Sequence, residues 1–156
     1  MKNLSKRAKE IIGQIKYATI ASVSENGLPW NAPVFTAFDE QYNFYFGTHK
    51  DSQKAKNIRA NGRVFLVIYD STVPVGTGEA VYIKASAQEV SDPSELRRIF
   101  ELLKERRKAT YWGFAALDAN GPIRLYKATP EQAWMNDAGS KNGHYIDTRT
   151  KIRLRD

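Results

Sequence analysis

The sequence contains no cysteine, so disulfide bridges, thiolate metal sites and a cysteine nucleophile are all excluded. Its two histidines, His49 and His144, are too few for a histidine-rich metal site. No window approaches 18 apolar residues, and the basic, amphipathic start does not have the pattern of an apolar signal segment. We therefore expect a soluble cytoplasmic protein with no metal and no membrane partner.

Recognisable catalytic arrangements are missing as well. The sequence has no Ser/His/Asp order and no pair of carboxylates with an evident spacing, so it assigns no catalytic residue. The composition is that of an ordinary globular protein, with 42% apolar and 26% charged residues. The length of 156 residues predicts a single domain, residues 1–156.

The charge balance is basic, since 24 Lys and Arg stand against 17 Asp and Glu and the net charge is +7. This balance favours an anionic ligand. A nucleic-acid partner is one alternative, but the basic residues are spread over predicted helix ends and the C-terminal tail, without aromatic residues interleaved on one strand face. We therefore expect a small-molecule ligand and no nucleic acid.

The hydrophobic pattern changes its period several times along the chain. Apolar residues spaced by four, seven and eight positions predict a helix near the start, and Asp92, Pro93 and Glu95 together predict the beginning of a later one. The predicted helices cover residues 4–15, 51–60 and 92–108, and the predicted strands cover residues 17–23, 30–38, 42–47, 63–69, 79–90, 122–128 and 131–136. Six to seven strands with three helices predict a mainly β fold, an antiparallel β-barrel with peripheral helices.

Three segments carry specific expectations. The apolar run Arg63–Tyr69 lacks alternation, which favours burial on both faces. Pro33 lies inside a predicted strand and indicates an edge, a bulge or a gap that faces a ligand, because proline has no N–H for the ladder. Residues 138–143 are small and polar and predict a flexible loop.

The most informative segment is residues 45–55, where a strand ends, a polar turn follows and a helix begins. Thr48 and Ser52 offer hydroxyl groups, Lys50 and Lys54 offer positive charge, and the helix start offers unpaired N–H groups. These are the components of a phosphate site. The alternative interpretation is a capped helix with solvated lysines, because helix starts often carry such residues.

The order of these features resembles the flavin-binding split-barrel proteins related to pyridoxamine 5'-phosphate oxidase. The segments that carry the resemblance are residues 18–23, 26–30, 33–35, 44–48, 52–55 and 61–64, with a looser fit at residues 130–134 and 147–149. Members of this family have a split β-barrel, bind FMN and are usually homodimers with a flavin at each of two sites between the subunits. The resemblance therefore implies FMN as the cofactor and a homodimer with the flavin at its interface.

The resemblance also implies which residues bind the cofactor. Residues 33–36 match the strand whose backbone meets the isoalloxazine ring, and residues 48–54 match the phosphate-binding turn. Gln53 stands where many members have a second basic residue. The complete implied set is Pro33, Val34, Phe35, Thr36, Thr48, Ser52, Gln53, Lys54, Thr77 and Trp134.

Several of the candidate residues have a plain structural alternative. The loop around Thr77 is either a close approach to the flavin or an ordinary turn of small residues. Trp112 and Trp134 are either pocket aromatics, contributed by the partner subunit, or residues of the core. His49 is either a ligand contact or a surface side chain.

Two departures from the family pattern concern the substrate. The oxidases that give the family its name have basic residues where this chain has Ala32 and Ala37, and a C-terminal Arg and His pair that His144 and Arg149 do not reproduce. The resemblance therefore implies an FMN-dependent oxidoreductase, reduced by NADH or NADPH, whose small-molecule substrate the sequence does not identify. The alternative is a non-catalytic protein of the same fold that binds a flavin, a deazaflavin or haem.

Overall fold

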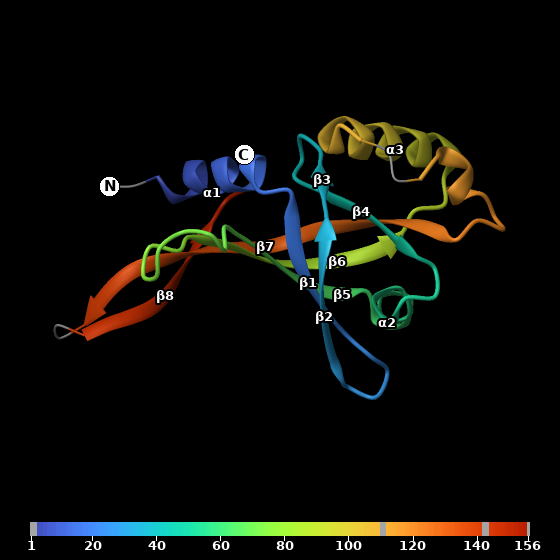
Figure 1. Cartoon of the computed structure of the whole chain (residues 1–156). Coiled ribbons are helices and arrows are strands. Elements are labelled where there is room, and N and C mark those ends of the chain that lie inside the picture. Colours follow the sequence, from blue (N-terminus) through green and yellow to red (C-terminus); the bar gives the residue numbers. More distant parts are fainter. Residues whose placement is uncertain (1–2, 110–111, 142–143, 156) are drawn as a thin grey trace.

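Eight strands and three α-helices make up the part of the chain that the structure describes (Figure 1). The structure is a computed structural model that describes residues 3–109, 112–141 and 144–155, with the backbone alone within residues 138–147. The helices are α1 (Leu4–Gln14), α2 (Gln53–Asn61) and α3 (Pro93–Arg107), with a short 3-10 helix, η1 (Phe114–Leu117). The strands are β1 (Tyr17–Val23), β2 (Pro29–Phe35), β3 (Ala37–Phe38), β4 (Phe44–His49), β5 (Arg63–Tyr69), β6 (Ala80–Glu89), β7 (Ile123–Lys141) and β8 (His144–Ile152).

The strands form one antiparallel sheet whose two ends are joined by a continuous piece of chain. The order along the sheet is β2-β1-β5-β6-β7-β4-β3, and β8 pairs with β7 outside this path. β2 leads through Thr36 into β3, so one segment pairs with β1 at one end of the sheet and with β4 at the other. The sheet therefore curls into a half-open barrel, and the predicted split-barrel fold class is confirmed. The path has seven strands, and the predicted C-terminal tail supplies the eighth.

Two hydrophobic clusters hold this barrel together. The larger one fills the barrel interior, where Ala8, Ile11 and Ile12 of α1 pack against inward-facing residues of the sheet. The smaller one lies under α3, where Ile99, Phe100 and Leu103 are buried. In Figure 1, α3 lies above β3 and β4, α1 lies beside the chain ends, and α2 lies close to the lower part of β1 and β2.

Helix α2 begins and ends where the sequence signals indicate. Ser52 is the N-cap, and its Oγ accepts a hydrogen bond from the Ala55 N–H at 3.3 Å. Gly62 ends the helix in the left-handed region with φ of 67°. A Cβ at this position would lie 2.8 Å from the carbonyl oxygen of Ala87, so both the backbone angle and the space require glycine. Asp51, where the predicted helix begins, lies just before this cap.

The predicted strand over residues 30–38 is divided in two. The Thr36 N–H donates to the Lys16 carbonyl oxygen at 2.9 Å, between the β2 ladder and the β3 ladder. Thr36 is therefore the point at which the segment leaves β1 and turns toward β4. Pro33 lies in β2, which is the strand at one end of the sheet path and pairs with β1 on one side. An edge position is one of the three explanations for Pro33 that the sequence allowed.

The predicted strands at residues 122–128 and 131–136 are one continuous strand, β7. Pro130 does not interrupt it, because the register with β6 shifts between Lys84 and Ala85 and leaves Glu131 as the extra residue of a β-bulge. β4 pairs with β7 as far as Ala128, and β8 pairs with it from Ala133. Proline is tolerated here because the ladder on that edge is interrupted at this point.

Two further expectations are wrong. The backbone of residues 138–141 continues β7 and pairs with β8, although these residues were predicted to be part of a loop at 138–143; residues 142 and 143 lie outside the described residues. β5 is not buried on both faces, because Val64, Leu66 and Ile68 are buried while Phe65 and Val67 on the outer face are half-buried. The uninterrupted apolar run of β5 therefore occurs in a strand that has one inner and one outer face.

Candidate functional site

The predicted phosphate turn is formed by side chains from the end of β4 and the start of α2. The Lys54 Nζ donates to the Thr48 Oγ1 at 3.1 Å, and the Thr48 and Ser52 hydroxyl oxygens lie 3.2 Å apart. The turn between them is closed by the Ser52 N–H, which donates to the His49 carbonyl oxygen at 3.0 Å. We refer to Thr48, Ser52 and Lys54 as the cradle. Two hydroxyls, one ammonium and a helix N-terminus therefore meet in one place, which suits a phosphate group.

Lys54 carries its charge in a partly desolvated position. Burial lowers the pKa of the Lys54 ammonium below its ordinary value, and its Nζ donates to the neutral Thr48 hydroxyl. A bound anion would offset this desolvation and raise the pKa again. The Lys54 ammonium therefore lies in an environment that disfavours its charge and that a bound phosphate would make more favourable.

A second group of charged residues lies next to the cradle, and the sequence reasoning missed it. Arg59 of α2 donates to the Lys50 carbonyl oxygen at 2.9 Å and to the Tyr126 hydroxyl at 3.2 Å. Burial and the neighbouring Glu89 carboxylate raise the pKa of Tyr126 to about 12. These contacts fix the turn before α2 against β7. The contacts join residues that are distant in sequence. The one local signal that could have indicated them is the spacing of nine residues between Lys50 and Arg59.

The strand that the resemblance assigns to the ring of the flavin, β2, presents two kinds of position. Val34 is buried in the larger hydrophobic cluster, and Thr36 is buried with its Oγ1 donating to the Lys16 carbonyl oxygen at 3.4 Å. Pro33 is exposed, and Phe35 packs edge-on against Tyr17 with ring centroids 5.8 Å apart. A hollow of about 340 Å³ lies beside Pro33, lined by residues 14–19, Pro33 and residues 69–71. Phe35 also packs against the smaller hydrophobic cluster, so within residues 33–36 it is Pro33 that lines this hollow.

Thr77 does not meet the cradle within one chain. It lies in the loop after β5, where its hydroxyl donates to the Pro74 carbonyl oxygen at 2.7 Å and Gly76 has a φ of 84°. The C-terminal end of α2 leads into Arg63, the first residue of β5, and the loop of Thr77 follows Tyr69, the last residue of β5. The seven residues of β5 place the C-terminal end of α2 and the start of this loop about 20 Å apart.

Trp134 lies on the outer face of the sheet, far from β2. Its ring stacks on the Phe65 ring with centroids 6.2 Å apart, and in the ladder between β7 and β6 it is paired with Tyr82 of β6. Pro33 and Trp134 belong to the same register row, but β1, β5 and β6 lie between their strands. Four strand spacings amount to about 19 Å, so the structure does not bring these two residues together in one chain.

Trp112 packs into the smaller hydrophobic cluster, in line with the core alternative. A Cβ on Gly47 would lie 2.9 Å from Trp112 Cζ2, and the Phe100 ring lies 5.7 Å from the Trp112 ring. Trp112 thereby covers the residue next to Thr48. His49 has a side chain that is 56% exposed, and its Nδ1 accepts from the Asp51 N–H at 3.2 Å, as expected for a surface side chain.

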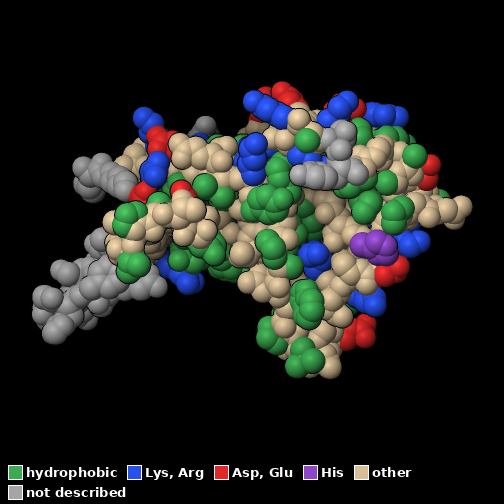
Figure 2. All heavy atoms as spheres, in the orientation of Figure 1, with side chains coloured by type: hydrophobic (Ala, Val, Ile, Leu, Met, Phe, Trp, Pro, Cys, Tyr) green, Lys and Arg blue, Asp and Glu red, His purple; other side chains and the backbone are tan. Residues whose placement is uncertain are grey.

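Apolar side chains gather on the outer side of the barrel, where no helix is drawn over β1 and β2. Figure 2 shows them over β1 and β2 and at the tip of the β1–β2 hairpin. Val75, in the loop after β5, is fully exposed, and Leu28 in the hairpin is 62% exposed. The large exposed apolar residues are Tyr17, Val23, Leu28, Trp30, Tyr69, Val73 and Val75. They form an outer patch that spans both ends of β1.

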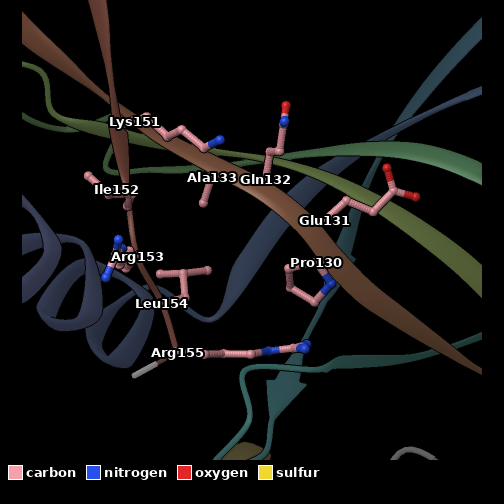
Figure 3. A pocket seen from close by; sticks show the side chains of 9 residues that line it. All are labelled: Pro130, Glu131, Gln132, Ala133, Lys151, Ile152, Arg153, Leu154 and Arg155. Carbon is pink, nitrogen blue, oxygen red and sulfur yellow. The ribbon is translucent and has the colours of Figure 1, made fainter.

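A separate hollow of about 220 Å³ lies between β7 and the C-terminal segment (Figure 3). It is lined by residues 130–133 and 151–155. None of the predicted site residues lines it, although Trp134 directly follows Ala133 in the sequence. It occupies the gap between the end of the β4 ladder and the start of the β8 ladder. This hollow is therefore distinct from the cradle.

The described residues contain no group of three or more His, Asp or Glu side chains that could hold a metal ion. Within the same residues, no helix is long and apolar enough to cross a membrane.

A barrel that curls from β2 to β3, with a polar turn that leads from β4 into α2, has the architecture of the split-barrel class. The family model described as pyridoxamine 5'-phosphate oxidase matches residues 4–137. The chain therefore belongs to this family, and the resemblance seen in the sequence is confirmed. A search of curated proteins gives no match.

Solved structures share the fold at low sequence identity. A candidate pyridoxamine 5'-phosphate oxidase from Listeria innocua is 20% identical, with a TM-score of 0.65 over 83% of this chain and 95% of that one. HutZ, the haem storage protein from Vibrio cholerae, is 19% identical, with a TM-score of 0.70 over 92% and 100%. A haem-binding protein from Mycobacterium smegmatis is 13% identical, with a TM-score of 0.72 over 96% of this chain and 59% of that one. The chain spans a similar share, 60% and 62%, of two further neighbours.

Proposed function

We propose that this protein binds FMN and is an oxidoreductase whose flavin is reduced by NADH or NADPH and acts on a small molecule. The observation that carries the proposal is the cradle, in which Lys54, Thr48 and Ser52 converge at the N-terminus of α2. Membership of the pyridoxamine 5'-phosphate oxidase family supports a phosphate-bearing ligand at this turn. The cytoplasmic location expected from the sequence belongs to the same proposal.

The residues of this chain fit FMN in two parts. Lys54 donates a charged hydrogen bond to the phosphate, the Thr48 and Ser52 hydroxyls donate further ones, and Gln53 lies beside them at the first position of α2. The edge of β2 at residues 33–36 offers backbone groups to the ring, and the hollow beside Pro33 gives it room. When bound, FMN supplies the redox chemistry, while the protein orients it and excludes water.

We further propose a homodimer that shares each flavin site between subunits. The outer patch has apolar residues at both ends, Leu28 and Trp30 in the hairpin and Val75 in the loop after β5. A two-fold axis through the middle of the patch exchanges these ends, so the loop of one subunit meets the hairpin of the other. This arrangement brings Thr77 and Trp134 of the partner toward the cradle, which a single chain does not do.

Haem is the second candidate ligand, because two proteins of the same fold are a haem storage protein and a haem-binding protein. His49 is the histidine whose side chain the structure describes, and it is exposed with its Nδ1 turned toward the Asp51 N–H. The cradle, by contrast, offers hydroxyl and ammonium donors, which suit a phosphate and not a haem iron. We therefore place FMN first.

The test of the cofactor is an absorption spectrum of the purified protein before and after addition of FMN and desalting. Retained flavin bands, and their loss on addition of NADH or NADPH, support the proposal, whereas a haem spectrum replaces it. Lys54→Gln should weaken FMN binding about 10- to 100-fold, because a charged hydrogen bond contributes about 1.5–3 kcal/mol. Lys56→Gln, on the same helix, is the matched control and should bind FMN like the wild type.

The shared site has its own test, since it predicts complementation between defective subunits. Lys54→Gln removes a cradle residue, and Trp134→Ala removes the residue assigned to the partner side. A mixed dimer of the two variants contains one site with both defects and one wild-type site, so a random mixture should recover about a quarter of the flavin sites. No recovery in a mixture that sediments as a dimer would show that each site belongs to one chain.

A further inference from the structure

A buried polar bridge connects the cradle helix to the hairpin that carries β2. The Asn57 side chain in α2 is 2% exposed and donates from Nδ2 to the Ser22 Oγ in β1 at 3.0 Å. Its Oδ1 accepts from Gln53 Nε2 at 2.8 Å, one turn earlier on the same helix. Ser22 is also 2% exposed and is paired in register with Trp30 of β2. The bridge thus runs from the first residue of α2 to the β1–β2 hairpin.

This bridge is unusual in its surroundings. The neighbouring α2 residues that face the sheet, Ala55 and Ile58, are apolar and buried. Apolar contacts alone would hold α2 on the sheet but would tolerate a small slide of the helix along its axis, because such contacts have no direction. A hydrogen bond of 3.0 Å between two buried side chains does not tolerate such a slide, because the unpaired groups would remain desolvated. Asn57 therefore fixes the axial position of α2.

The axial position of α2 sets the distance between the two halves of the proposed FMN site. Ser52 and Lys54 of the cradle lie at the start of α2, while residues 33–35 lie in β2, on the hairpin that Ser22 anchors. Resting on the proposed function, we propose that Asn57 is a positioning residue that sets the spacing between the phosphate-binding cradle and the ring-binding strand. FMN needs both halves at once, whereas riboflavin, which lacks the phosphate, needs the strand alone.

The chain supplies a matched control at the other end of the same helix. Asn61 also ties α2 to the hairpin, through its Nδ2 donating to the Val23 carbonyl oxygen at 3.3 Å, but this contact is exposed. It lies at the last residue of α2, two turns from the cradle. Loss of the Asn61 contact should leave the first turn in place, so Asn61→Ala is expected to preserve binding of both flavins.

The experiment measures the affinities of FMN and riboflavin by quenching of flavin fluorescence, in the wild type, Asn57→Leu, Ser22→Ala, the double variant and Asn61→Ala. We expect Asn57→Leu and Ser22→Ala to reduce FMN affinity about tenfold, because the two subsites no longer act on one ligand together, and to change riboflavin affinity less than about twofold. Urea unfolding is measured on every variant. The double variant removes both polar partners and should regain stability, yet its preference for FMN over riboflavin should stay low.

Each outcome decides the question. Equal losses for both flavins, or a double variant whose preference for FMN returns with its stability, would show that the bridge only stabilises the fold. If Asn57→Leu does not fold, Ser22→Ala removes the same bond with a smaller change, and an unaltered preference in that variant overturns the inference. A wild-type protein that binds neither flavin would refute the proposed function, and the positioning role with it, whereas normal wild-type binding with unaffected variants refutes the positioning role alone.

Discussion

Arg106 of α3 is the side chain whose removal should most clearly separate packing from hydrogen bonding in this fold. Its Nε donates to the Thr36 carbonyl oxygen at 2.8 Å, and its Nη2 donates to the carbonyl oxygens of Ile12 and Ile15 at 2.8 and 2.9 Å. A longer bond of 3.3 Å reaches the Gly13 carbonyl oxygen. One guanidinium therefore joins α3 to the C-terminal end of α1 and to the junction of β2 and β3.

The magnitude follows from these contacts. Each short bond from a charged donor contributes about 1.5 kcal/mol net, so the three would contribute about 4.5 kcal/mol if burial cost nothing. The guanidinium is partly buried, which lowers the pKa of Arg106, and the cost of removing it from water reduces this sum. Arg106→Met, which keeps the apolar stem, should therefore lower the free energy of unfolding by about 3 kcal/mol. For a domain of this size the corresponding fall in Tm is about 6–12 °C.

Urea unfolding of Arg106→Met, Arg106→Lys and Arg97→Met tests this reasoning. Lysine keeps the charge but cannot present a planar fork to three carbonyls, so Arg106→Lys should recover less than half of the loss. Arg97 lies over the Phe114 ring at 3.6 Å, and its replacement should cost less than about 1 kcal/mol. If Arg106→Met unfolds within 1 kcal/mol of the wild type, the carbonyls of α1 and Thr36 find water instead, and the idea that Arg106 clamps them is refuted.

The remaining predictions concern space and pH. Gly47→Ala should destabilise the fold by about 1–3 kcal/mol, because the added Cβ would lie 2.9 Å from Trp112 Cζ2. Gly13→Ala should stabilise α1 by about 0.5 kcal/mol, because its Cβ would meet nothing within 4 Å. Urea unfolding of both variants measures these changes. The pKa of Tyr126 is raised to about 12, above its unfolded value of 10, so its contribution to stability is complete below pH 10 and is lost as the pH rises toward 12. Between pH 10 and 12, the free energy of unfolding of Tyr126→Phe should therefore fall less than that of the wild type. Parallel curves of unfolding free energy against pH for the two proteins would contradict this prediction.

Local signals made the elements around the cradle predictable. Ser52 and Gly62 bound α2 through contacts within a few residues, and the hydroxyls and lysine of the cradle fall within seven positions of one another. The short runs of β-forming residues at Tyr17–Val23 and Arg63–Tyr69 likewise coincide with β1 and β5. The caps of α2 and the cradle have their partners close in sequence, and the two strands are indicated by their own composition, so a local stretch of sequence is enough to predict each of them.

What the sequence did not show depends on distant partners. Pro130 ends a strand by ordinary rules, yet β7 passes through it, because β4 and β8 both leave this stretch of its edge unpaired. The glycine and serine of residues 138–141 favour a loop, but β8 pairs with them. The bridge from Asn57 to Ser22 spans 35 positions and has no periodic signature, so it appears only in the folded chain.

The candidate site itself shows the same division between local and distant relations. Thr48 and Lys54 form the cradle within one turn of chain, and the structure brings them together. Thr77 and Trp134 were assigned by resemblance to the same site. In one chain, however, the loop of Thr77 begins about 20 Å from the C-terminal end of α2, and Trp134 lies four strands away from Pro33. A family resemblance collects residues that share a ligand without regard to which copy of the chain carries them, so this separation is what a site built from two subunits requires. The apolar run of β5 is consistent with the same reasoning. Its inner residues fill the barrel, and its half-buried outer residues, Phe65 and Val67, lie on the face that the proposed dimer would cover.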